Sequence, residues 1–317
     1  MTVTDTDIKA AVAAGILTEA QAASLTHLSN TRNNAIHQTG ASDEPFELFR
    51  GFNEVFIVVG IIILATGWSG LIGASFTSQI SNVQESAVIY GLIGAAILWG
   101  LSEYFIRRRR MVAPAIVLSV YFAGNAAVAL TAYFAQPFMV AQEDFSSLPL
   151  PFALATLCLV FYWWRFRVPF AMAMLAVGFF IVALLVAATQ SGTPESLADL
   201  FLLSAGGPFA WITLALGVIV FGVAMAFDMS DPHRVTLRAS NGFWLHVVAA
   251  PALVNTIALT MLERQSAAAN ASLVAILCVF ALVAIIIDRR SFLLAAIGYS
   301  VALAMTLIEP GQIALII

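Results

Sequence analysis

Nine long apolar runs recur along the chain, and they constrain its fold more than any other feature. Each holds about 17–25 residues, the length that an α-helix needs to cross the hydrocarbon core of a bilayer. They lie near 52–76, 86–106, 111–135, 148–164, 168–189, 207–228, 241–262, 271–287 and 291–308. The final residues, "QIALII", look like the start of another run. The sequence therefore predicts an all-α, polytopic transmembrane helix bundle of about nine to ten spans over 46–317.

The composition supports a membrane environment for these helices. Of the 317 residues, 61% are hydrophobic and 10% are charged, whereas soluble domains are about one quarter charged. No soluble fold hides so much apolar surface, so the lipid bilayer is the first partner that the sequence implies.

The basic residues fix the predicted orientation. Of the 14 Lys and Arg residues, all except Arg264 fall on one side of the nine-span arrangement. The positive-inside rule then places the N-terminus in the cytoplasm. Basic turns near 107, 165, 234 and 289 precede apolar helices at regular spacing, which indicates repeated helical hairpins.

Residues 1–45 are predicted to form a separate cytoplasmic helical hairpin and linker. "TDTD" from Thr4 can cap a first short helix and Gly15 can end it. "TEAQ" from Thr18 to Gln21 fits a capping box for a second helix. The hairpin is too small to be firmly stable alone, so we expect it to dock on the membrane part or on a protein partner.

Ionisable residues within or beside the runs gather toward the predicted cytoplasmic face. Such groups are costly in a membrane and are functional candidates by default. We expect His246 to face the bundle interior and to approach at least one of Glu54, Glu103 or Asp228. The full candidate polar cluster is Glu54, Glu103, Asp228, Asp231, His233 and His246.

A purely structural interpretation of this cluster stays open. Glu103 and Arg107 are four residues apart and can simply pair along one helix. The residues from 228 to 240 can form an ordinary polar loop. A histidine such as His246 can also be a packed, hydrogen-bonded side chain.

Small residues on the seventh run indicate close helix packing. Gly242, Ala249, Ala252, Thr256 and Thr260 recur on one narrow helical face. A second small-residue face on the first run comprises Gly60, Gly67, Gly70 and Ala74. Asn125 and Asn255 are predicted near mid-membrane, as candidates either for a binding cavity or for hydrogen bonds between helices.

Several chemistries find no support in the sequence. A metal site from Asp228, Asp231, His233 and His246 lacks tight ligand spacing, and no motif indicates a cofactor. Basic residues spread over membrane turns do not indicate nucleic-acid binding. The run Arg107, Arg108, Arg109 and Arg110 favours a topology determinant that can also touch anionic lipid.

The chain also resembles a group of uncharacterised bacterial inner-membrane proteins that have a short helical head followed by many spans. Three segments carry the resemblance: "AVAAGILTEAQAASL" from Ala11, "DEPFELFRGFNEVFIVVG" from Asp43 and "FWLHVVAAP" from Phe243. The resemblance implies the topology and no particular mechanism.

Two functional classes are favoured. One is a small-solute or lipid transporter with a polar cavity that faces the cytoplasm. The alternative is a non-catalytic scaffold or sensor that docks a partner through its N-terminal helices, and an integral membrane enzyme is the least favoured class. A cavity beside Asn125 or Asn255 would favour transport, whereas a solid bundle would favour a scaffold.

Overall fold

The protein is a bundle of long helices in the computed structural model, which describes residues 5–38, 53–78, 83–136, 139, 144–233, 236–264, 266–287 and 297. Short 3-10 turns at Leu197–Leu200 and Leu203–Ala205 precede α8. The helices are α1 (Asp5–Ala13), α2 (Glu19–Gln38), α3 (Asn53–Ser78), α4 (Val83–Ser102), α5 (Val112–Phe134), α6 (Pro149–Phe166), α7 (Pro169–Ser191), α8 (Phe209–Ser230), α9 (Leu237–Glu263) and α10 (Ala267–Ile287).

Eight of the helices in the described part, α3 to α10, are long and apolar enough to cross a membrane. They correspond in order to the first eight predicted spans, so the prediction of an all-α, polytopic bundle is confirmed. The predicted ninth span at 291–308, the linker at 39–45 and the final "QIALII" lie outside the described residues. The apolar side chains that the bundle leaves exposed, such as Leu64 and Ile286, suit contact with lipid.

The N-terminal helices form as their local sequence signals predict. The Thr18 N–H donates to Gln21 Oε1 at 3.0 Å, and the Gln21 N–H donates to Thr18 Oγ1 at 3.2 Å, which is the reciprocal bonding of a capping box. Gly15, just past the end of α1, has a left-handed φ of 69°, which glycine adopts without steric cost. Helices α1 and α2 pack against each other.

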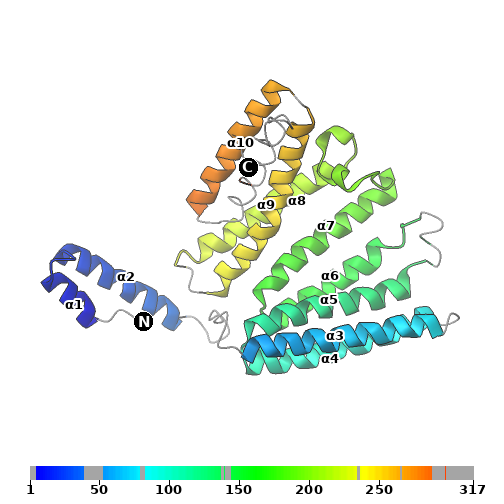
Figure 1. The fold of residues 1–317 in the computed structure, drawn as a ribbon, viewed down its shortest axis with the longest axis horizontal. Helices are drawn as coiled ribbons and strands as arrows, with labels where there is room; N and C mark the ends of the chain where they lie inside the picture. The colour runs from blue at the N-terminus through cyan, green and yellow to red at the C-terminus, as the bar shows by residue number, and fades with distance from the viewer. Residues whose placement is uncertain are drawn as a thin grey trace, which may run out of the picture.

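The membrane helices pack mainly against their neighbours in the chain (Figure 1). Helix α4 packs on α5, α6 on α7 and α8 on α9, and α5 also contacts α3 and α6. Helix α7 joins the two parts of the bundle because it contacts α5 and α6 as well as α8 and α9. Three hairpins stacked in this way agree with the predicted hairpin repeat.

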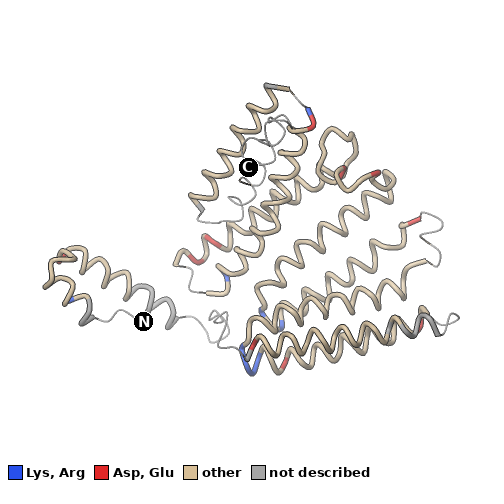
Figure 2. The backbone as a smooth tube through the Cα atoms, viewed as in Figure 1, with Lys and Arg blue, Asp and Glu red and all other residues tan. Residues whose placement is uncertain are grey.

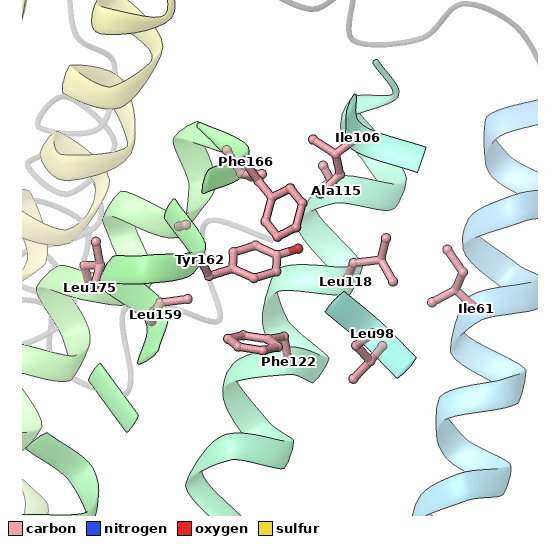
Figure 3. Packing of buried hydrophobic residues seen from close by; sticks show 12 residues of the cluster. Ile61, Leu98, Ile106, Ala115, Leu118, Phe122, Leu159, Tyr162, Phe166 and Leu175 are labelled. Atoms are coloured by element: carbon pink, nitrogen blue, oxygen red, sulfur yellow. The ribbon is translucent and has the colours of Figure 1, made fainter. Parts of the chain in front are cut away.

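An aromatic cluster fills the core between α4, α5 and α6 (Figure 3). The Tyr162 ring is fully buried and lies 4.7 Å from the Phe122 ring and 4.6 Å from the Phe166 ring, measured between centroids. Its hydroxyl forms a 2.7 Å hydrogen bond with Ser102 Oγ. A buried tyrosine hydroxyl needs such a partner, so this bond ties α4 to α6.

One end of the bundle carries most of the described basic residues, as Figure 2 shows in the segment after α4, at the end of α6 and at the start of α9. We call this the basic end, defined by Arg107–Arg110, Arg165, Arg167 and Arg238. Arg264 caps the other end of α9, as the predicted topology requires. Two tight turns at the basic end have the same backbone feature. Arg110 and Arg167 adopt left-handed φ values of 53° and 54°.

Two sequence expectations need correction. Residues 228–230 belong to α8 and residues 237–240 belong to α9, so the predicted loop from 228 to 240 is only a short turn. The glycine face predicted on the first run is not a packing face within the described part. No described atom lies within 4 Å of a Cβ built at Gly60, Gly67 or Gly70. Close approach instead occurs on α4, at Gly91 and Gly94.

Candidate functional site

The candidate site is centred on the α8–α9 hairpin at the basic end. Thr236 caps α9, because its Oγ1 accepts a hydrogen bond from the Arg238 N–H at 3.2 Å. Asp231 is 5% exposed and accepts from the N–H of Thr236 at 2.9 Å and from its hydroxyl at 2.7 Å. These bonds hold the turn, so the structure gives Asp231 a structural role.

A buried histidine and a carboxylate meet between these helices. His246 is 0% exposed, and its Nε2 lies 3.0 Å from Asp228 Oδ2. His246 stands nine residues into α9, about 14 Å along the axis at 1.5 Å per residue. The expected approach of His246 to one of the three carboxylates is therefore present, and the partner is Asp228. The pair is ionic only when the imidazole is protonated.

The two helices approach closely around this pair. All five residues of the predicted small stripe on α9 are buried, and a Cβ built at Gly217 of α8 would lie 3.2 Å from the Cβ of Ala252. A Cβ built at Gly242 would lie 2.5 Å from Asp228 Oδ1 and 3.2 Å from the Ala224 carbonyl oxygen. The glycine at 242 therefore makes room for the carboxylate that meets His246, and the predicted packing stripe is confirmed.

The other members of the predicted cluster lie elsewhere. Glu103 contacts Arg165 at 2.8 Å and Arg107 at 3.4 Å, so the pairing of Glu103 with Arg107 is confirmed. Glu54 is 1% exposed on α3, which packs against α4 and α5. His233 is exposed in the α8–α9 turn. Within the described part, no group of three His, Cys, Asp or Glu side chains is placed to hold a metal ion.

A cavity of about 390 Å³ opens on the same hairpin, among α6, α8 and α9. This volume falls within the usual range for small-molecule sites, about 300–1,000 Å³. We call it the arginine cavity. Its apolar wall includes Val223, Ala226 and Phe227. Its polar lining comprises Trp163, Arg167, Ser230, Arg238 and Asn241.

A second cavity of about 200 Å³ lies beside Asn125, near the middle of α5. Asn125 donates from Nδ2 to the Tyr121 carbonyl oxygen at 2.9 Å. The indole Nε1 of Trp68, which also lines this cavity, is buried without a hydrogen-bond partner among the described residues. A side chain at Gly94 would fill the space between these two groups. Asn255 lines neither of these cavities.

Sequence reasoning missed the arginine cavity because its lining comes from three separated segments. Arg167 and Arg238 were predicted only as topology signals, and Asn241 only as the first residue of the seventh apolar run. No spacing rule connects these positions. In the structure, α9 begins four residues before the predicted run, which places Arg238 on the same helix as Asn241.

No protein-family model, curated protein or solved structure matches this chain. The functional argument therefore rests on the geometry described above.

Proposed function

We propose that this chain is a membrane transporter that moves a small solute or a lipid through the arginine cavity. We place that cavity on the cytoplasmic side of a bacterial inner membrane, with the N-terminus in the cytoplasm. The observation that carries the proposal is the cavity itself, about 390 Å³ with polar side chains from three helices at the basic end. A scaffold needs no such internal volume.

The position of the cavity supports transport over simple surface binding. It lies against the α8–α9 hairpin, which also holds the buried His246–Asp228 pair, and Asp228 directly follows the lining residue Phe227 in α8. The Asn125 cavity supplies a second space, nearer the middle of the membrane helices. We propose that the functional part of the predicted polar cluster is the His246–Asp228 pair.

The proposal can be tested by blocking the cavity in proteoliposomes. Ala226→Trp adds a large side chain to the cavity wall, whereas Val218→Trp adds the same group at an exposed position of α8 outside it. Uptake of a panel of small anions and movement of fluorescent phospholipid between leaflets would both be measured. We expect at least one flux that Ala226→Trp abolishes and Val218→Trp preserves. Transport through this cavity would be rejected if both variants gave equal flux, or if the wild-type flux did not exceed that of protein-free vesicles.

One observation favours the second candidate function, a scaffold or sensor. Apolar side chains on the N-terminal helices are exposed, with Ile16 at 75%, Leu25 at 40% and Leu28 at 57%. Such side chains suit a docking surface for a protein partner. A photo-crosslinker at Leu28 would test this in cells, because a scaffold requires crosslinks to another chain rather than to the membrane helices of the same chain.

A further inference from the structure

We propose that the arginine cavity recognises a phosphodiester whose headgroup also carries a hydrogen-bond donor, a hydroxyl or an ammonium group. A glycerophospholipid offers this chemistry, and so does its soluble deacylated headgroup. The inference rests on the proposed function, because it names the class of substrate for the same cavity.

The charge of the cavity calls for an anion. Neither Arg167 nor Arg238 has a carboxylate partner in the described part of the chain, and the cavity lining contains no acidic residue. Arg165, two residues from Arg167, is instead paired with Glu103. Two guanidinium groups that no described carboxylate neutralises lie beside one cavity and suit a phosphate group, which arginine binds through parallel N–H donors.

Arg167 is held in place before any ligand binds. Its guanidinium carbon lies 5.5 Å from the centre of the Trp163 ring, and its Nε donates to the Trp164 carbonyl oxygen at 3.2 Å. No hydrogen bond from its terminal nitrogens occurs among the described residues, so these nitrogens can serve a ligand. A pre-positioned side chain loses less conformational entropy on binding, which strengthens association.

The start of α9 adds a second attraction for an anion. Arg238 is the second residue of this helix, and the first turn contains no acidic residue. A cation at a helix N-terminus is unfavourable because the backbone dipoles already place positive charge there. A bound phosphate would offset both charges.

Asn241 indicates the second half of the ligand. It is 7% exposed, lines the cavity, and its Oδ1 has no hydrogen-bond partner in the described structure. The indole Nε1 of Trp163 is likewise buried without a partner. Buried polar atoms are nearly always hydrogen-bonded. Nε1 can donate to a phosphate oxygen, whereas Oδ1 needs a donor, which a hydroxyl or ammonium headgroup provides.

Equilibrium binding to the purified full-length chain in detergent tests the inference. The probes are phosphatidylglycerol, its deacylated headgroup, phosphatidylmethanol, which lacks the donor, and diacylglycerol, which lacks the phosphate. The variant R167Q/R238Q removes both cavity charges. The matched control R107Q/R108Q removes the same charge from the same end of the bundle, outside the cavity.

We expect R167Q/R238Q to weaken binding of phosphatidylglycerol by about 100-fold, since each charged hydrogen bond contributes about 1.5 kcal/mol or more. The control should change binding by about five-fold or less, because its two charges lie outside the cavity. Wild type should prefer phosphatidylglycerol to phosphatidylmethanol, and Asn241→Leu should remove that preference. Binding of the deacylated headgroup as tight as that of the lipid would assign a soluble phosphoester, and much weaker binding would assign the lipid.

Three results would overturn the inference: diacylglycerol binding as tightly as phosphatidylglycerol, the control losing as much affinity as R167Q/R238Q, or no preference for the donor-bearing headgroup. These outcomes are separate from those of the transport test. Phosphodiester binding without any flux would reject the transporter and leave the inference standing. Flux of another solute without phosphodiester binding would support the transporter and reject the inference.

Discussion

The substitution Gly242→Ala tests how tightly α8 and α9 are built around the buried pair. Its Cβ would lie 2.5 Å from Asp228 Oδ1, about 1 Å closer than an ordinary van der Waals contact of roughly 3.5 Å. Either the carboxylate moves away, or α9 withdraws from the Ala224 carbonyl oxygen. The other carboxylate oxygen contacts His246 at 3.0 Å, so a shift of about 1 Å would break that contact.

The expected cost follows from these alternatives. Losing a buried hydrogen bond to a charged group costs about 1.5–3 kcal/mol, and overpacking a core costs about 1–3 kcal/mol. Replacing a helical glycine by alanine returns roughly 0.5–1 kcal/mol. We therefore expect Gly242→Ala to destabilise the protein by about 1–2 kcal/mol. At Gly222 of α8, no described atom lies within 4 Å of a built Cβ, so Gly222→Ala should be neutral or slightly stabilising.

Thermal unfolding of the purified chain in detergent would measure the difference. At roughly 2–4 °C per kcal/mol, Gly242→Ala should melt about 2–8 °C below wild type. If the clash acts through the histidine contact, Gly242→Ala should cost less in a His246→Ala background, because Asp228 can then move freely. A melting temperature for Gly242→Ala at or above that of Gly222→Ala would refute the close-packing argument.

Four further outcomes are expected. A cysteine at Arg109 should resist membrane-impermeant labelling from the periplasmic side of intact cells, and rapid labelling would invert the topology. Deleting residues 1–45 should leave insertion intact, and failure to insert would make the hairpin part of the core. His246→Ala should reduce transport while expression and insertion persist, whereas a lower melting temperature with unchanged transport would mark the histidine as structural. Gly91→Ala should destabilise the protein relative to Gly100→Ala, because only the Cβ at 91 would meet the next helix, 2.8 Å from the Ala129 Cβ; equal stability would count against tight packing of α4 on α5.

Features governed by local or one-dimensional rules could be predicted from the sequence. The spans follow from the length of apolar runs, and the capping box at Thr18 follows from four adjacent residues. The sequence could limit the possible partners of His246 to three carboxylates, because residues at similar depth in antiparallel helices can meet. Choosing Asp228 among them required knowing that α9 packs on α8.

Features that depend on which helices become neighbours could not be predicted. A stripe of small residues on the first run has the same appearance as the one on α9, yet only the stripe on α9 packs closely against a described helix. Composition also gave the wrong boundary between α8 and α9. Polar residues such as Arg238 and Ser240 suggest a loop, but the cap at Thr236 and the bonds of Asp231 stabilise a helix that starts earlier.

The position of Asp228 couples the stability of the hairpin to the chemistry of the cavity. Its carboxylate belongs to the helix segment that supplies Phe227 and Ser230 to the arginine cavity, and it faces His246 and Gly242 on α9. A ligand that shifts the end of α8 must therefore strain or release the His246 contact. Removal of His246 should then alter ligand affinity even though the histidine does not line the cavity. An unchanged affinity in His246→Ala would mean that the end of α8 stays fixed on binding, and that the pair serves packing alone.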